Sequence, residues 1–144
     1  MRAWQVHAWG EPETMTLAQA ELPEPAAGQV RIRTRAAGIN FFDILQIQGK
    51  YQYKPPFPFT PGAEVAGLVD AVGQGVTEFA AGDAVLALTH GNGFAEYAVA
   101  DAARTFRIPP GMSFGEAAVL PIVYHTALFA LQHRAALGAG EWLL

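Results

Sequence analysis

The chain has 144 residues, of which 51% are hydrophobic and 15% charged, with a formal net charge of -4 at pH 7 and no cysteine. This length suits one domain that buries a substantial core without disulfides or a structural metal. The nine Lys and Arg residues are scattered and the net charge is negative, which argues against a nucleic-acid partner. The lack of cysteine excludes disulfides and thiolate zinc sites.

Short apolar segments separated by turn residues at regular spacing predict a mainly β, barrel-like domain. Gly and Asn in the separating segments, such as 73–75 and 91–93, supply the positive φ angles of tight turns. Apolar and basic side chains alternate over residues 30–35, which predicts one buried and one solvated face. The predicted strands cover residues 3–7, 15–21, 29–37, 64–72, 83–88, 93–100 and 105–108.

A first short helix is predicted over residues 40–48. Asn40 is suited to its N-cap, because the side-chain oxygen of asparagine can accept a backbone N–H of the first turn. Asp43 then stands at the third helical position, where an acidic side chain completes a capping box.

A second helical region begins at Ser113, which forms a capping box with Glu116. Pro121 is expected to divide it into two helices that end near Gly138. Its most apolar segment, residues 117–131, is too short to span a membrane, which takes about 20 apolar residues, and residues 1–8 lack the apolar core of a signal peptide. We therefore expect a soluble, cytoplasmic protein with no membrane partner. The region carries an apolar stripe that needs a covering surface, made of Leu120, Val123, Ala127, Leu128 and Leu131.

Residues 36–51 (AAGINFFDILQIQGKY) and 59–67 (FTPGAEVAG) say most about function. Together they resemble the N-terminal GroES-like catalytic domain of the medium-chain dehydrogenase/reductase superfamily. The chain is similar to its zinc-independent quinone oxidoreductase (zeta-crystallin-like) branch, because zinc-dependent alcohol dehydrogenases carry cysteine where Asn40 stands and histidine where Ala63 stands. The resemblance implies an α+β fold on a GroES-like β-barrel. It also implies NADPH-dependent reduction of quinones or α,β-unsaturated carbonyls by hydride transfer.

Asn40 is the central candidate for the chemistry. The resemblance implies that it lies beside the nicotinamide end of NADPH and the substrate carbonyl, as a catalytic and a cofactor-binding residue. A carboxamide can donate a hydrogen bond to a carbonyl oxygen that gains negative charge during hydride addition. The residue pattern by itself favours a helix cap, whereas the resemblance favours the chemical role.

The resemblance supplies two further candidates. Tyr51 matches a tyrosine that lines the substrate cleft, where a phenol can hydrogen-bond a quinone oxygen and stack on its ring; simple packing is the alternative. Thr126 matches a threonine whose hydroxyl meets the nicotinamide portion, and a bond to its own helix backbone is the competing account. Asp43 is interpreted as a structural capping carboxylate, and Glu64 as an anchor for neighbouring backbone or an arginine.

No metal site is predicted. The four histidines show no pair at ligand spacing with a third donor nearby, and Asn40 and Ala63 replace the zinc ligands of related enzymes. Leu45 and Ile47 stand where better-known bacterial members have a tyrosine and an arginine. We therefore expect a more apolar substrate pocket.

The segment around Gly138 and Gly140 resembles the approach to the first strand of a nucleotide-binding Rossmann domain, and the glycine-rich loop of that domain does not follow. We expect residues 1–144 to form one GroES-like domain truncated before the Rossmann domain, with residues 113–144 leading toward it. By itself the chain should bind NADPH weakly and be inactive. Two alternatives remain: a free-standing GroES-like interaction module, or a fragment of an enoyl-thioester reductase.

The resemblance also predicts self-association, most simply as a homodimer. The family covers the second helical region with its cofactor domain and a C-terminal return segment, and residues 1–144 are expected to contain neither. The apolar side chains expected to face water are Val123, Leu128, Leu131, Trp142, Leu143 and Leu144.

Overall fold

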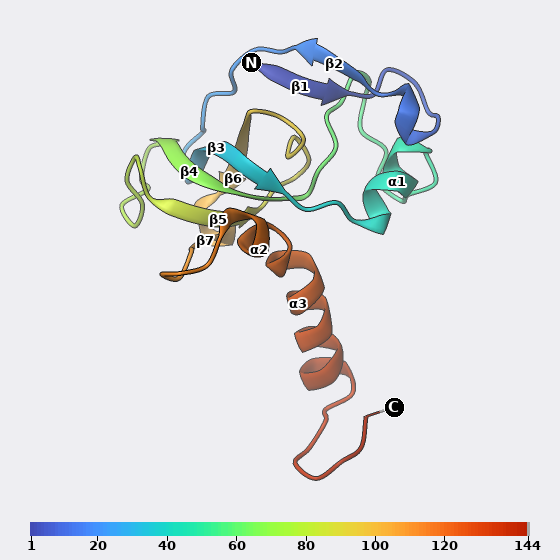
Figure 1. Cartoon of the computed structure of the whole chain (residues 1–144), viewed down its shortest axis with the longest axis vertical. Helices are drawn as coiled ribbons and strands as arrows, with labels where there is room; N and C mark the ends of the chain where they lie inside the picture. Colours follow the sequence, from blue (N-terminus) through green and yellow to red (C-terminus); the bar gives the residue numbers. More distant parts are fainter. Residues whose placement is uncertain (144) are drawn as a thin grey trace.

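The computed structural model describes residues 1–143, and its body is built mainly of antiparallel β-strands (Figure 1). The strands are β1 (Arg2–Gln5), β2 (Thr16–Gln19), β3 (Gln29–Ala37), β4 (Glu64–Val72), β5 (Ala84–Leu88), β6 (Tyr97–Asp101) and β7 (Thr105–Arg107). Five of them form one curved sheet in the order β6-β3-β4-β5-β7, and β1 pairs with β2 in a separate ribbon. The prediction of a mainly β domain with short helices is confirmed.

The helices lie at the margins of this body. They are α1 (Phe41–Ile47), α2 (Phe114–Ala118) and α3 (Leu120–Leu128), followed by a π-helical segment (Phe129–Arg134); single 3-10 turns lie at Pro12–Thr14 and Ala102–Arg104. In Figure 1, α1 lies near the β1–β2 ribbon, α2 covers the sheet, and α3 points away from the body. Within residues 1–143, the helices are all too short or too polar to cross a bilayer.

Strand β3 shows how the alternating sequence pattern sets the faces of the sheet. Val30 and Ile32 are fully buried, as their spacing predicts. Arg31 lies between them in the sequence and is on the opposite face of the strand, where its guanidinium pairs with Asp70 at 2.7 Å. This pair joins β3 to β4 on the outer face.

The apolar core is divided among three clusters. The main cluster covers one face of the sheet and consists of Val30, Ile32, Val65, Val69, Val85, Ala87, Ala98, Ala100 and Ala102. The second packs α2 against β4 and β5 and consists of Ala66, Leu86, Ala117 and Ala118. The third holds α1 against the chain after β1 and consists of Val6, Ile47 and Phe59.

The third cluster corrects one expectation. Ile47 was expected to line a substrate pocket, and this was wrong: its side chain is 2% exposed and packs with Val6 and Phe59. An apolar side chain on the inner face of a short amphipathic helix gains more from burial than from a place in an open cleft.

The predicted strands are all present, and the largest difference in their limits falls in residues 93–100, where β6 starts late. Here Gly93 and Phe94 donate backbone hydrogen bonds to the carbonyls of Gly62 and Pro61, both at 3.0 Å. These residues hold the loop that leads into β4, so they do not extend the sheet.

The break in the C-terminal helical region was expected at Pro121 and lies two residues earlier. Val119 ends α2 with φ -100° and ψ 0°. Pro121 instead occupies the first turn of α3. Backbone N–H groups there have no acceptor within the helix, so proline loses no hydrogen bond, and its fixed φ suits a helix.

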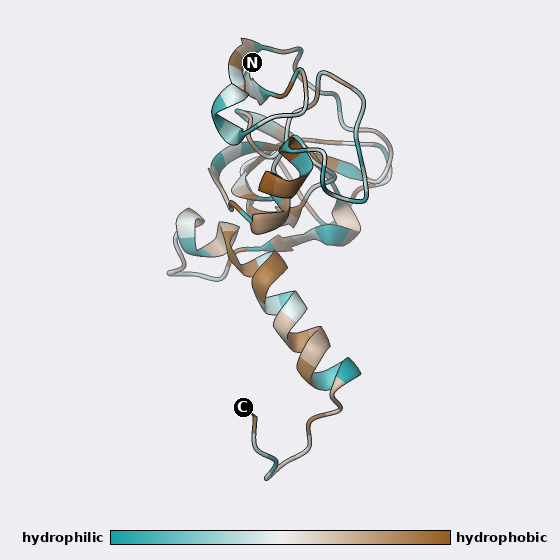
Figure 2. Ribbon diagram, turned by 90° about the vertical axis from the view of Figure 1, so that its right-hand side faces the viewer, coloured by the Kyte–Doolittle hydropathy of each residue, from teal (hydrophilic) through white to brown (hydrophobic). Residues whose placement is uncertain are grey.

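Hydrophobic and polar residues alternate along α3 (Figure 2), and the predicted apolar side chains are largely exposed among them. Val123 and Leu128 are each 50% exposed, and Trp142 and Leu143 beyond the helix are also exposed. Leu131 is half-buried, and Leu144 lies outside the described residues.

The close approach of β3 and β4 gives a test of this fold. A Cβ at Gly67 would overlap the carbonyl oxygen of Arg33, a backbone atom that cannot move without disturbing the sheet. We expect Gly67→Ala to lower the free energy of unfolding by about 3 kcal/mol in urea denaturation. As a control, Gly115→Ala adds a Cβ whose nearest neighbour is 4.0 Å away, within α2, and should raise stability by about 0.5–1 kcal/mol. Equal effects would contradict this account.

Candidate active site

The N-terminus of α1 is held by the predicted capping arrangement. Asn40 has extended backbone angles (φ -118°, ψ 155°) at the N-cap position. The Asp43 carboxylate accepts the backbone N–H of Asn40 at 2.8 Å. The backbone of Asn40 is thereby fixed at the point where β3 leads into α1.

The side-chain carboxamide of Asn40 makes a further contact, which the sequence did not predict. Its Nδ2 donates a hydrogen bond to Oε1 of Glu64 at 2.8 Å. Because a carboxylate only accepts, the amide must turn its NH₂ group toward Glu64. That group has two N–H bonds, and within residues 1–143 the second has no hydrogen-bond partner. Asn40 is half-buried, so one N–H remains available to a bound molecule.

Glu64, the first residue of β4, is 1% exposed and uses both carboxylate oxygens. Oε2 accepts the backbone N–H of Ile122 at 2.8 Å. Ile122 lies in the first turn of α3, where backbone N–H groups have no partner inside the helix. The predicted anchoring of neighbouring backbone by Glu64 is therefore confirmed, and no arginine takes part within the described residues.

Asp43 lies beside this arrangement and is also 1% exposed. Burial raises the pKa of its carboxyl group, and the negative charge of Glu64 raises it further. The nearby backbone N–H groups of Asn40 and Gly62 favour the ionised form and offset part of this increase in pKa. Asp43 therefore caps α1 as predicted, and it does so from inside the core.

Tyr51 lies in the loop that follows α1, and Thr126 lies on α3. The Tyr51 ring is half-buried and meets the edge of Phe42 in α1, with ring centroids 5.1 Å apart. Thr126 is exposed on α3, four residues after Ile122 and so on the same face of that helix. Its hydroxyl makes no hydrogen bond to the helix backbone in the part of the chain that is described, which removes support from the competing account.

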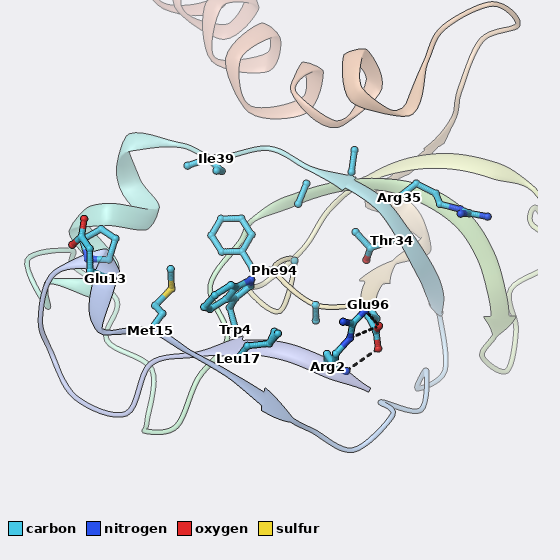
Figure 3. A pocket seen from close by; sticks show the side chains of 15 residues that line it. Arg2, Trp4, Glu13, Met15, Leu17, Thr34, Arg35, Ile39, Phe94 and Glu96 are labelled. Carbon is cyan, nitrogen blue, oxygen red and sulfur yellow. Dashed lines mark hydrogen bonds and ion pairs between the residues drawn. The ribbon is translucent and has the colours of Figure 1, made fainter.

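A cavity of about 750 Å³ lies elsewhere, between the β1–β2 ribbon, β3 and the loop at Phe94 (Figure 3). Its apolar lining includes Trp4, Met15, Leu17, Ile39 and Phe94. Asn40, Tyr51 and Thr126 do not line it. We therefore locate the candidate active site by the hydrogen-bond donors at Asn40 and not by the size of this cavity.

The described residues include no cluster of three or more His, Asp or Glu side chains that could hold a metal ion. Of the two positions that hold zinc ligands in related enzymes, Asn40 donates a hydrogen bond to the Glu64 carboxylate and Ala63 has no side-chain atom that can bind a metal. That the protein binds no zinc stays a prediction.

Fold and sequence together define a catalytic domain of the alcohol dehydrogenase type. Residues 26–110 match the alcohol dehydrogenase GroES-like domain family, and the chain belongs to that family. It is 40% identical over 146 residues to quinone oxidoreductase of Sus scrofa, covering 100% of this chain and 44% of that protein. It is 42% identical over 127 residues to quinone oxidoreductase-like protein 2 of Mus musculus, covering 88% of this chain and 36% of that protein.

Solved structures agree with these relatives. The human synaptic vesicle membrane protein VAT-1 homolog-like protein superposes with a TM-score of 0.94 at 36% identity, over 97% of this chain and 45% of that one. Mycobacterial Rv1454c complexed with NADPH gives a TM-score of 0.90 at 30% identity, over 98% of this chain and 44% of that one. The predicted resemblance to the quinone oxidoreductases of the medium-chain superfamily is confirmed. The chain spans less than half the length of these relatives.

The raised pKa of Asp43 gives a test with a definite sign. A carboxyl group with a folded-state pKa above its ordinary 3.8 binds its proton more tightly in the folded state. Stability therefore falls as pH rises from the ordinary to the raised pKa. Asp43→Asn removes this titration. Urea denaturation from about pH 4 to about pH 8 should show the stability of the variant, relative to the original protein, increasing with pH and then levelling.

Asp83→Asn is the control with the opposite sign. Arg107 lies 2.8 Å from the Asp83 carboxylate and holds its pKa below the ordinary value. The original protein should therefore be more stable than Asp83→Asn above that ordinary value, and lose the advantage as pH falls through the lowered pKa. A difference between Asp43→Asn and the original protein that does not change with pH would refute the assignment.

Proposed function

We propose that the chain is the catalytic-domain portion of a zinc-independent, NADPH-dependent oxidoreductase that reduces quinones or α,β-unsaturated carbonyls by hydride transfer. The main support is the Asn40 amide, which is fixed by Glu64 through one N–H and retains another N–H for a ligand. Relatives named quinone oxidoreductase, and a related structure complexed with NADPH, support the reaction class.

The residues present suit one end of NADPH only. Asn40 offers an amide N–H at the start of α1, and Thr126 offers a hydroxyl in the second half of α3. Residues 135–143 form turns and irregular chain, which do not provide the strand, glycine loop and helix that bind a pyrophosphate. We assign the pyrophosphate and adenosine contacts to residues of the whole protein outside 1–143. When bound, NADPH supplies the hydride.

The residues of this chain would bind and polarise the substrate. Asn40 donates its remaining N–H to the substrate carbonyl oxygen, and this bond strengthens as negative charge grows on that oxygen. Because the amide is neutral, it can do so without losing a proton. Tyr51 contributes an aromatic surface and a phenol, while Thr126 meets the nicotinamide.

The exposed apolar face of α3 favours one other candidate, a free-standing interaction module without activity. The affinity of the chain for NADPH can be measured by calorimetric titration. We propose that the chain of residues 1–144 by itself binds NADPH more weakly than about 1 μM, because a few hydrogen bonds do not offset the cost of immobilising a flexible dinucleotide.

We also propose that the protein is located in the cytoplasm. The lack of cysteine supports this location, because it fits a compartment in which disulfides do not form.

The function is tested in the whole enzyme, with this domain joined to its nucleotide-binding domain. Asn40→Ala should lower kcat/KM by about 10- to 1000-fold, as expected for the loss of one donor to a developing oxyanion. The exposed Gln52→Ala serves as the control and should leave kcat/KM unchanged. Full activity of Asn40→Ala would make Asn40 a structural residue only. Comparing benzoquinone with a crotonyl thioester separates quinone reduction from enoyl-thioester reduction.

We propose further that residues 1–144 form a homodimer through the apolar face of α3. Sedimentation at about 100 μM should show a dimer, because soluble monomers rarely leave so large an apolar patch uncovered. Leu128→Glu should give a monomer. Leu22→Glu changes a similarly exposed leucine far from α3 and should leave the dimer intact. A monomer of the unaltered chain that binds no hydrophobic dye would refute the proposal.

A further inference from the structure

Glu64 stands between two segments that are far apart in the sequence. One oxygen accepts from the Asn40 side chain and the other from the Ile122 backbone, both at 2.8 Å. A Cβ at position 38 would overlap the carboxylate, so Gly38 is needed for Glu64 to reach Asn40. The site is thus shaped around the carboxylate.

Among the described residues, the Glu64 carboxylate is compensated by hydrogen-bond donors and not by a cation. Its side chain is 1% exposed, and among residues 1–143 no lysine or arginine pairs with it. A buried carboxylate without a cation is costly unless its oxygens are bonded, and bonds to an ionised acceptor are stronger than neutral ones. Asn40 and Ile122 are therefore held firmly.

The contact with Asn40 also sets a direction. An amide NH₂ group is planar, so fixing one N–H fixes where the other points. The donor proposed for the substrate oxygen is then oriented before the substrate binds, which is the condition for effective stabilisation of a developing oxyanion. Through Ile122 the same carboxylate sets the start of α3, the helix that carries Thr126 one turn further on.

We propose that Glu64 is a positioning residue, which orients the Asn40 amide and fixes α3 relative to the barrel through one shared carboxylate. The catalytic consequence rests on the proposed function, whereas the arrangement itself can be tested in the 144-residue chain without any activity. The competing role is a folding anchor that holds α3 and has no effect on Asn40.

The first variant is Glu64→Gln, which keeps the size of the side chain and replaces one acceptor oxygen with a donor NH₂. With the Asn40 amide in its present orientation, the glutamine oxygen can accept from Asn40 or from Ile122 but not from both. If the Asn40 amide turns over, its oxygen accepts from the glutamine NH₂, and the Asn40 NH₂ group loses its partner. In either arrangement the Asn40 NH₂ group no longer donates to a carboxylate, so its side-chain signals in ¹⁵N NMR spectra of the chain should shift. Asn40 signals that stay in place would overturn the proposal, because a simple anchor of α3 predicts no change there.

The second variant is the charge-conserving swap N40D/E64Q. The glutamine NH₂ can then donate to the new aspartate, and the glutamine oxygen can accept from Ile122. Both hydrogen bonds are thereby restored, and the one between positions 40 and 64 now has its donor at position 64. Asn40→Asp alone places two carboxylates face to face and should speed Ile122 exchange at least about tenfold. The swap should restore Ile122 exchange to within about threefold of the original protein.

Failure of the swap to restore Ile122 exchange would overturn the proposal, and so would its failure to fold, because it provides partners for the same groups. In the whole enzyme the swap should remain impaired, since an aspartate at position 40 cannot donate to the substrate. If NMR shows the expected changes while Asn40→Ala keeps full activity, the positions of Asn40 and α3 are explained and only the proposed function fails.

Discussion

The buried carboxylate of Glu64 is the interaction on which the candidate site depends. A charge that is 1% exposed and has no cation beside it within the described residues must be satisfied by hydrogen-bond donors. Those donors come from the N-cap of α1 and the first turn of α3, so meeting the needs of one carboxylate joins both helices to β4. Asp43 secures α1 from the other side by capping it from within the core.

The rest of the domain gives this arrangement a rigid base. Strands β3 and β4 lie so close at Gly67 that no side chain fits between them, and their side chains form the centre of the main core cluster. Asn40 lies three residues after the end of β3, and Glu64 opens β4. Because the two residues lie at the ends of paired strands, their separation is set by the sheet and not by mobile loops.

Helix α3 is less well packed against the rest of the domain than the strands of the barrel are. The helix points away from the body and exposes Val123 and Leu128, although its first turn is firmly bonded to Glu64 (Figure 1). A helix that is anchored at one end and exposes such apolar side chains is suited to carry a further contact. The chain covers less than half of the length of its relatives.

The sequence by itself determined the local structure. Alternation of apolar and polar residues located the strands, and Asn40, Asp43, Ser113 and Glu116 marked the helix starts, because these signals act over a few residues. The resemblance around Asn40 supplied the candidate residues. Only the tertiary structure showed that Glu64 holds both Asn40 and Ile122, which lie 24 and 58 residues away, and that Ile47 is in the core. Contacts between such distant positions depend on how the strands pair, and no pattern within a short segment encodes them.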